Sequence, residues 1–466
     1  MSTVPQVPAL LWYVAGYAVI MTLIGIWSSK GLETSEDFIL AGKGLGTFVL
    51  MGTLLATWCG SGTVTGGGNS RAYMFGPWNA MIGIPITVLA VYLMYLIAPA
   101  IRKHGKYTVA ELLETKYGPT ARVLAAIIVL LAYVGITSYQ YKGLGFVLNV
   151  TTGMSVELGT YLSAALIIFL AMAGGLKSVA FTDALSAILM IAGLVLAVPY
   201  AIKAAGGWNT LTSSVPPTMM TMTGGLTWLQ LAGYLLPGVI LQIGDQNMYQ
   251  RLAASRGDKE AKLSMIGWVV GLLITSVTVP LIAFAARGIF PNIDAGMALI
   301  STTTVIPRFI GGLLLASAAA FIITTGDSYL LSCATNVTYD IYVQHINPNA
   351  TDKQKFFLTR VVCLVLGLLA FVVLQFFPTI LAAQMYAYTV YGAGLTPAIL
   401  AVFFWKNVTK AGGIASMLVG VATTLWWEFA KPMDFNSVLV SVPAAVLALI
   451  VVSLATQSSV KKEVAS

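Results

Sequence analysis

The chain has 466 residues, of which 58% are hydrophobic and only 9% are charged, and its mean hydropathy is +0.86. Soluble domains carry about a quarter charged residues, so this composition excludes an ordinary soluble domain and predicts an all-α integral membrane protein. The formal net charge of +8 raises the question of a nucleic-acid partner, which the placement of the basic residues answers below.

Membrane-spanning helices need about 20 mostly apolar residues, and we identify thirteen such segments. In chain order they are 9–28, 44–66, 72–100, 121–149, 158–175, 180–202, 226–249, 263–287, 306–342, 357–377, 381–405, 411–430 and 435–456. The segment 306–342 is too long for one straight span, so we expect it to be strongly tilted or to extend past the membrane.

The basic residues indicate how these spans are oriented. With the N-terminus outside, nineteen of the 25 Lys and Arg residues fall in inside loops, and Lys142 lies within a span. The outside loops then hold Arg71, Lys203, Arg287, Arg308 and Lys431. Because cytoplasmic loops are enriched in Lys and Arg, this asymmetry predicts a multi-pass protein of the plasma membrane with its C-terminus in the cytoplasm. It also accounts for the net charge, so we expect the lipid bilayer and no nucleic acid as a partner.

The stretch Leu54 to Gly68, LLATWCGSGTVTGGG, interrupts an apolar span with five glycines. Each glycine costs a helix about 1 kcal/mol relative to alanine, so the stretch predicts a broken helix. Transporters place substrates and ions at such breaks, where freed backbone groups face a cavity. The alternative is an unbroken helix whose glycines allow tight packing against its neighbours.

A second interrupted span follows at Tyr234 to Gln250, YLLPGVILQIGDQNMYQ. It begins about 180 residues after the first break, five spans later, so the two broken helices enter the membrane from opposite sides. That arrangement is typical of two inverted five-helix repeats with a site between them. We therefore divide the chain into an extra N-terminal helix, two repeats and two C-terminal helices. Their boundaries are 9–28, 44–202, 226–405 and 411–456.

Ionisable residues within spans are costly and therefore mark candidate sites. Asp327 lies in ITTGDSYLLS, where Thr324, Thr325 and Ser328 place further oxygen atoms within about one helical turn. Hard cations such as sodium favour oxygen ligands of this kind. Alternatively, the Thr and Ser hydroxyls bond back to carbonyls one turn earlier, as they commonly do in membrane helices.

Four segments together resemble the sodium:solute symporter family. They are YTVAELLETKYG (107–118), GGLKSVAFTDALS (174–186), DQNMYQRLAASRGDKEAK (245–262) and TTGDSYLLSCATNVTYDIY (324–342). The resemblance covers about residues 10–410, with one departure at Ser186, where the family usually has Gln. It implies a LeuT-type fold of 5+5 inverted repeats and sodium as the coupling ion.

The resemblance also implies a sodium site made of backbone carbonyls and hydroxyls. Its ligands on this sequence are Ala56, Cys59, Phe321, Thr324 and Thr325. A second sodium, bound in some members, would use Asp183 with Thr324, Asp327 and Ser328. Alternatively, Asp183 is a proton-linked or structural carboxylate.

The identity of the solute stays open at this point. The segment ATWCGSGTVTGG is most similar to the choline-transporter branch, which favours a quaternary ammonium held against the indole of Trp58. Lys142 favours a carboxylate instead, because a cation facing the cavity would repel choline. The residues expected to bind the solute are Trp58, Ser61, Thr63, Gln140, Lys142 and Gln242.

These patterns predict a transporter rather than an enzyme, with no catalytic residues. Its expected activity is sodium-coupled symport of a small organic solute into the cell by alternating access. A proton-coupled symporter, with Asp183 or Asp327 as the proton carrier, is the nearest rival. A passive facilitator of similar fold is another.

Overall fold

The computed structural model describes residues 4–28, 40–104, 108–173 and 176–463, and within these ranges it is helical, with one isolated β-bridge between Leu45 and Ser255. The long helices are α1 (Ala9–Ser28), α3 (Thr47–Trp58), α6 (Ile84–His104), α8 (Pro119–Thr152), α9 (Val156–Ala173), α10 (Leu176–Ala204), α12 (Trp228–Gly244), α14 (Asp258–Ile289), α16 (Arg308–Thr335), α17 (Asp352–Leu374), α18 (Ile380–Phe404), α19 (Lys410–Ala430) and α20 (Val438–Glu463). The shorter ones are α4 (Gly67–Phe75), α5 (Pro77–Met81), α7 (Val109–Tyr117), α11 (Trp208–Ser213), α13 (Gln246–Ala253) and α15 (Ala298–Thr302).

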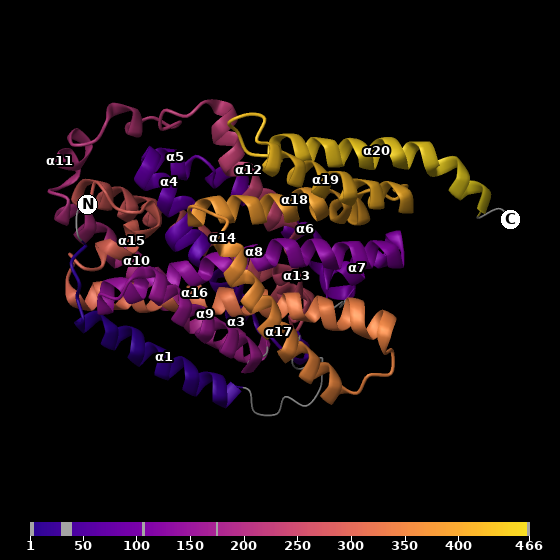
Figure 1. Cartoon of the computed structure of the whole chain (residues 1–466), viewed down its shortest axis with the longest axis horizontal. Coiled ribbons are helices and arrows are strands. Elements are labelled where there is room, and N and C mark those ends of the chain that lie inside the picture. The colour runs from indigo at the N-terminus through magenta and orange to yellow at the C-terminus, as the bar shows by residue number, and fades with distance from the viewer. Residues whose placement is uncertain (1–3, 29–39, 105–107, 174–175, 464–466) are drawn as a thin grey trace.

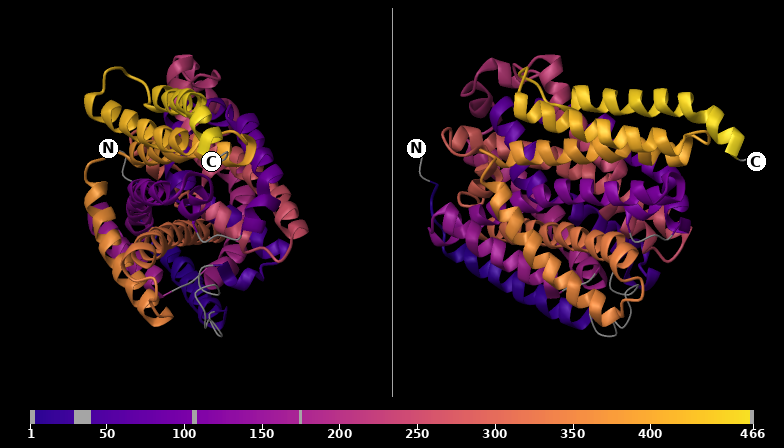
Figure 2. Two further views of the ribbon diagram at one scale, coloured as in Figure 1. Left: turned by 90° about the vertical axis from the view of Figure 1, so that its right-hand side faces the viewer. Right: turned by 45° about the vertical axis from the view of Figure 1, so that its right-hand side comes forward.

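The helices form one bundle whose two chain ends lie far apart. Helices α8, α16, α18, α19 and α20 run along the longest axis of the molecule, whereas α1 and α17 cross it obliquely (Figure 1). The start of α1 lies at one end of the bundle and the end of α20 at the other, and the right-hand view of Figure 2 shows the same separation. The charge pattern predicts that the two termini lie on opposite sides of the membrane. This arrangement is compatible with that prediction.

Length and composition make nine of the described helices able to cross a membrane, and a tenth span results if one bent pair counts as a single helix. Two shorter apolar helices, Ala9–Ile24 and Val156–Met172, accompany them. The number of about thirteen spans therefore stays a prediction. The segment predicted at 306–342 is one span of 39 residues, Arg308–Ile346, whose last eleven residues are wound as a π-helix.

The span that contains α16 lies at the centre of the bundle. In its most apolar window 83% of the residues are buried, compared with 28% for α17. A helix that is apolar all round and buried belongs at the centre of a bundle, whereas α17 keeps an apolar face for lipid. Helix α16 contacts α8 and α10 on its flanks and α3 at the first break.

The first break is real, but the span continues beyond it. Helix α3 ends at Trp58, a π-helical turn covers Gly62–Gly66, and α4 resumes at an angle of 54°. The predicted boundaries of 44–66 were therefore wrong, because the polar segment after the glycines is helical rather than a loop. This correction moves Arg71 from an outside loop into a helix of the core.

The second break lies at Asp245, between α12 and α13. Asp245 is extended, and its carboxylate caps α13 by accepting hydrogen bonds from the backbone N–H groups of Asn247 (2.7 Å) and Met248 (3.2 Å). An aspartate at this position stabilises the positive end of the helix dipole. The predicted span 226–249 is thus two helices, and the boundaries of the two inverted repeats stay a prediction.

Candidate functional site

The end of α3 lies against the middle of α16. The hydroxyl of Thr325 donates to the backbone carbonyls of Ala56 (3.1 Å) and Thr57 (3.3 Å). Because α3 stops at Trp58, its last carbonyls have no intrahelical partner and are free to accept from another helix. Gly60 permits the close approach, since a Cβ atom there would collide with the Thr325 side chain. Freed carbonyls and a hydroxyl therefore meet at one point in the core.

Three further residues predicted for the sodium site lie around this point. The hydroxyl of Thr324 bonds back to the carbonyl of Phe321 at 3.5 Å, as the alternative interpretation of this pair expects. Cys59 caps the end of α3, where its N–H donates to Leu55 at 2.9 Å. Thr325 differs from its neighbour because its hydroxyl bonds across to the other helix. The oxygen atoms that the hydrogen bonds bring together across the two helices belong to Ala56, Thr57 and Thr325.

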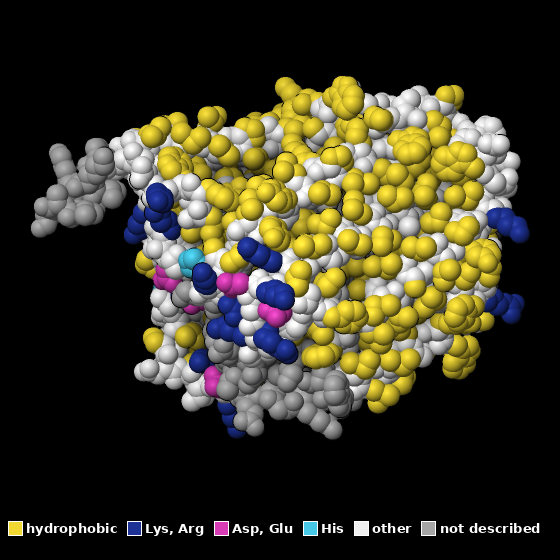
Figure 3. Space-filling view, turned by 180° about the vertical axis from the view of Figure 1, so that it is seen from behind, with side chains coloured by type: hydrophobic (Ala, Val, Ile, Leu, Met, Phe, Trp, Pro, Cys, Tyr) yellow, Lys and Arg dark blue, Asp and Glu magenta, His cyan; other side chains and the backbone are white. Residues whose placement is uncertain are grey.

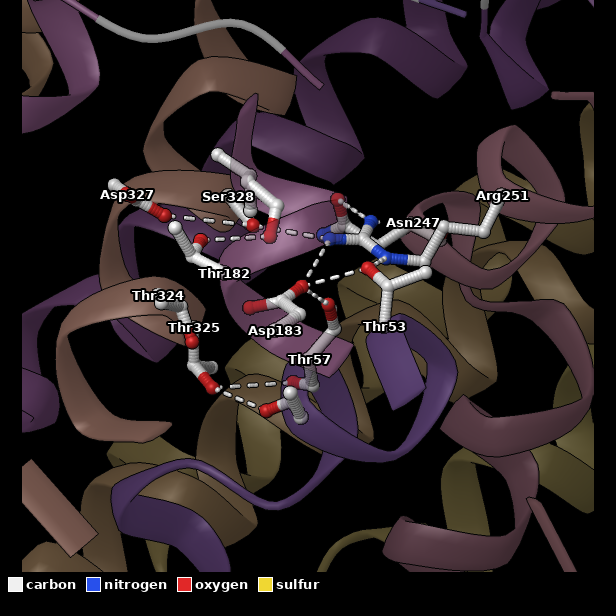
Figure 4. Close-up of polar contacts among 12 residues, drawn as sticks. Thr53, Thr57, Thr182, Asp183, Asn247, Arg251, Thr324, Thr325, Asp327 and Ser328 are labelled. Carbon is white, nitrogen blue, oxygen red and sulfur yellow. Dashed lines mark hydrogen bonds and ion pairs between the residues drawn. The ribbon is translucent and has the colours of Figure 1, made fainter. Parts of the chain in front are cut away.

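Asp183 lies next to this cluster and is fully buried (Figure 4). One carboxylate oxygen, Oδ2, accepts hydrogen bonds from Thr53 at 2.6 Å and Thr57 at 3.4 Å, and it pairs with Arg251 at 3.7 Å. The other oxygen, Oδ1, is buried with no hydrogen-bond partner among the described residues. A buried carboxylate oxygen without a partner is unfavourable, so this arrangement leaves a position that a cation would stabilise.

Arg251 of α13 is a fully buried residue beside this cluster that the sequence did not mark as a site residue. Its guanidinium donates to Thr53 at 2.9 Å and to Ser328 at 3.1 Å, and the hydroxyl of Ser328 lies 3.5 Å from Asp327. The inside loop predicted between the spans 226–249 and 263–287 was wrong at Arg251, because α13 is a buried helix. Two of the residues predicted for a second sodium, Asp183 and Ser328, therefore contact a guanidinium, as Figure 4 shows.

A cavity of about 160 Å³ lies beside the first break, between α3, α4, α12, α14 and α18. Three of the residues predicted to bind solute line it, namely Trp58, Thr63 and Gln242. The Trp58 ring stacks on Tyr388 at 6.2 Å between centroids and meets Trp268 edge-on at the same distance. These contacts fix the indole as one aromatic wall of the cavity.

The other three residues predicted to bind solute are not among those that line the cavity. Gln140 is buried behind the wall, where its amide oxygen accepts from the N–H of Ser61 at 2.8 Å. The hydroxyl of Ser61 bonds to Thr65. Lys142 contacts Asp294 at 3.7 Å and so lies beside an acidic partner on the loop before α15. The conflict between Trp58 and Lys142 over solute charge is therefore absent from the cavity itself.

A wider vestibule of about 840 Å³ adjoins the cavity and shares Tyr234 and Met385 with it. At the other end of the bundle, a pocket lined by Thr108, Gln246 and neighbouring residues measures only about 20 Å³. There Arg122 pairs with Asp340 at 2.7 Å, and Thr108 donates to the same carboxylate at 3.0 Å. The cavity thus adjoins the wider space at one end of the molecule, and the pocket at the other end is small.

Known proteins resemble this chain over most of its length. The sodium:solute symporter family model matches residues 38–420. Two relatives in Bacillus subtilis (strain 168) are the osmoregulated proline transporter OpuE, 26% identical, and the high-affinity proline transporter PutP, 27% identical. The alignment with OpuE covers 96% of this chain and 94% of OpuE. The alignment with PutP covers 94% of this chain and 96% of PutP. A sodium/proline symporter of Escherichia coli (strain K12) is 26% identical, over 88% of this chain and 85% of its own.

Solved structures share the fold. An outward-open, substrate-bound sodium-coupled sialic acid symporter superimposes with a TM-score of 0.82 at 20% identity, covering 96% of this chain and 97% of its own. The nucleobase-cation-symport-1 transporter Mhp1 in a closed conformation gives a TM-score of 0.64 at 12% identity. This match covers 93% of this chain and 97% of Mhp1. Both likenesses confirm the predicted LeuT-type fold. The chain belongs to the sodium:solute symporter family, and it is a multi-pass membrane transporter, not an enzyme, that couples sodium to the symport of a small solute.

Proposed function

We propose that sodium binds where the end of α3 meets α16, with the carbonyls of Ala56, Cys59 and Phe321 and the hydroxyls of Thr324 and Thr325 as ligands. The observation that carries this proposal is the pair of hydrogen bonds from Thr325 to the freed carbonyls of Ala56 and Thr57. Hard cations favour such oxygen atoms, and a bound ion would replace these hydrogen bonds by coordination. Sodium would then hold the two helices together.

One sodium ion per transport cycle fits the buried charges. Two buried carboxyl groups, those of Asp183 and Asp327, share this part of the core with one guanidinium, which lies 3.7 Å from Asp183. When both carboxyls are ionised, one further cation beside the hydroxyls of α16 balances the charge. A second sodium bound by Asp183, Thr324, Asp327 and Ser328 would have to share its position with the Arg251 guanidinium.

The solute site is the cavity beside Trp58, with Thr63 and Gln242 among its contacts. Its volume of about 160 Å³ is close to that of an engineered cavity that binds benzene, about 150 Å³. A solute with fewer than about ten non-hydrogen atoms fits this space better than a sugar acid does. The relatives are named as proline transporters, so L-proline is the first solute to test.

The geometry also supports a cycle of alternating access that delivers the solute into the cell. The vestibule adjoins the cavity at the end of the bundle opposite the Lys and Arg cluster that Figure 3 displays. Two corrections, at Arg71 and Arg251, leave the basic residues strongly concentrated on the predicted inside, although Lys30 and Lys106 lie outside the described residues. We therefore place the vestibule outside, the C-terminus in the cytoplasm and the protein in the plasma membrane.

Uptake into proteoliposomes tests this function. An inward sodium gradient should drive accumulation of radiolabelled L-proline, and an inside-negative potential should increase it, since 100 mV adds about 2.3 kcal/mol per translocated charge. Uptake driven equally well by a proton gradient in sodium-free buffer would identify the proton-coupled rival. Exchange that never exceeds equilibration, with or without sodium, would identify a facilitator.

A further inference from the structure

The cavity wall contains a buried cation, Arg71, that forms no ion pair with an acidic residue in the described part of the chain. Arg71 of α4 is 5% exposed, and its Nε donates to the side-chain oxygen of Asn79 at 3.1 Å, while Nη2 bonds to that oxygen and to the Asn79 carbonyl. The guanidinium also lies 5.9 Å from the ring centre of Tyr234. No described carboxylate forms an ion pair with Arg71, and its third nitrogen, Nη1, has no protein acceptor in the described part of the chain.

A second polar side chain in the same wall also lacks a partner. Gln242 of α12 is 1% exposed, and its amide nitrogen is buried with no hydrogen-bond partner among the described residues. Buried amides are almost always hydrogen-bonded, and an unpaired one costs about 1–3 kcal/mol. Gln242 lines the same cavity as the helix break and belongs to α12, on the broken span of the other predicted repeat. Two donors from two broken spans are therefore available at one cavity.

The charge balance of the wall indicates what these donors recognise. Among the described residues that line the cavity, Arg71 is the one charged side chain, and its neighbours are aromatic, apolar, or uncharged and polar. An uncompensated guanidinium favours an anion and disfavours a cation such as choline. Lys142 does not change this balance, because it lies beside Asp294 and does not line the cavity.

We propose that Arg71 and Gln242 bind the carboxylate of the transported solute, while the rings of Trp58 and Tyr388 cover its aliphatic or amino part. This inference rests on the proposed solute site and narrows its substrate class to small carboxylates, including zwitterions. The choline-like sequence around Trp58 then supplies an aromatic wall without selecting a quaternary ammonium as such. Arg71 thereby takes the role that the sequence analysis gave to Lys142.

Two matched pairs of solutes test the carboxylate directly. L-proline and L-prolinamide differ at the carboxylate, as do glycine betaine and choline. Thermal stabilisation of the purified protein in sodium chloride, compared with potassium chloride, should occur with a carboxylate of either pair and not with its partner. Acetate, pyruvate and lactate extend the panel to carboxylates without an amino group.

Variants of Arg71 and Gln242 test whether these two donors cause the stabilisation by carboxylates. Arg71→Met should raise the concentration of the stabilising carboxylate needed for half-maximal effect by about tenfold to a hundredfold, because it removes a charge-assisted hydrogen bond. Arg71→Lys should give a half-maximal concentration between those of the wild type and Arg71→Met. Gln242→Leu should raise the half-maximal concentration about tenfold. Arg287→Met is the matched control, since Arg287 also lies over a tyrosine ring, that of Tyr73 at 5.2 Å, but does not line the cavity.

The outcomes separate this proposal from the proposed function. Equal stabilisation by an amide or by choline, or an unchanged concentration dependence in Arg71→Met, would overturn the carboxylate site. Failure of every carboxylate while sodium alone still stabilises the protein would also overturn it and would leave sodium coupling intact. Loss of any sodium effect in the wild-type protein would contradict the proposed function instead.

Discussion

Nη2 of Arg251 lies 3.7 Å from Oδ2 of Asp183, and both side chains are buried in the core of the bundle. This ion pair joins α13 to α10, and further contacts of the guanidinium extend it to Thr53 of α3 and Ser328 of α16. Four helices that surround the proposed sodium site therefore share one charged network. Buried pairs of this kind are costly to break, because the remaining partner keeps an uncompensated charge.

Replacing one member of this pair should destabilise the protein strongly. We expect Asp183→Asn and Arg251→Met each to cost about 3–5 kcal/mol, and the double variant to cost less than the sum of the two. Thermal unfolding of the purified variants measures this. Strictly additive losses would show that the two side chains do not act as a pair.

Removing the guanidinium should also change the sodium dependence of transport. Arg251→Gln leaves Asp183 and Asp327 without their cationic neighbour and frees the space that a second sodium would need. We expect the Hill coefficient for sodium to rise from about one in the wild type toward two in this variant. A wild-type coefficient near two would contradict the assignment of one sodium ion per cycle.

The hydroxyl of Thr325 should be essential for tight sodium coupling. Thr325→Ala removes a proposed ligand and should raise the sodium concentration for half-maximal uptake by about tenfold or more, whereas Thr325→Ser keeps the hydroxyl and should change it little. Thr278→Ala is the control, because the Thr278 hydroxyl bonds to Ile274 of its own helix at 2.7 Å. If Thr325→Ala and Thr278→Ala raised the half-maximal sodium concentration equally, the cause would be a general loss of packing and not a lost ligand.

Trp58 should matter for solute binding more than for sodium binding. Trp58→Ala removes the aromatic wall and its contacts with Tyr388 and Trp268, so we expect the half-saturating solute concentration to rise about tenfold. Trp58→Phe should restore most of the affinity. Uptake titrated separately in solute and in sodium distinguishes the two effects, and a purely structural tryptophan would lower expression without changing either value.

Membrane-impermeant thiol labelling can determine the orientation. All three native cysteines are buried, so background labelling should be low. In intact cells Lys431→Cys should react, whereas Lys259→Cys should react only after the membrane is permeabilised. The reverse pattern would place the vestibule on the cytoplasmic side.

The sequence predicted the positions of both helix breaks because glycine, proline and a capping aspartate act locally. It missed the short helix on the far side of each break. Helices α4 and α13 are short and polar, so Arg71 and Arg251 looked like loop residues, although both lie in the core. A basic residue a few positions beyond a predicted break is the signal that would have identified them. The directions in which the side chains of Ser61, Gln140 and Lys142 point depend on how three helices pack against one another. No local sequence pattern predicts that packing.

Sodium binding at the junction of α3 and α16 is the central claim, and direct binding of radioactive sodium to the purified protein tests it most directly. We predict saturable binding of about one ion per chain in the wild type and in Thr278→Ala, with affinity reduced about tenfold or more in Thr325→Ala. Binding of unchanged affinity in Thr325→Ala would contradict the proposed site.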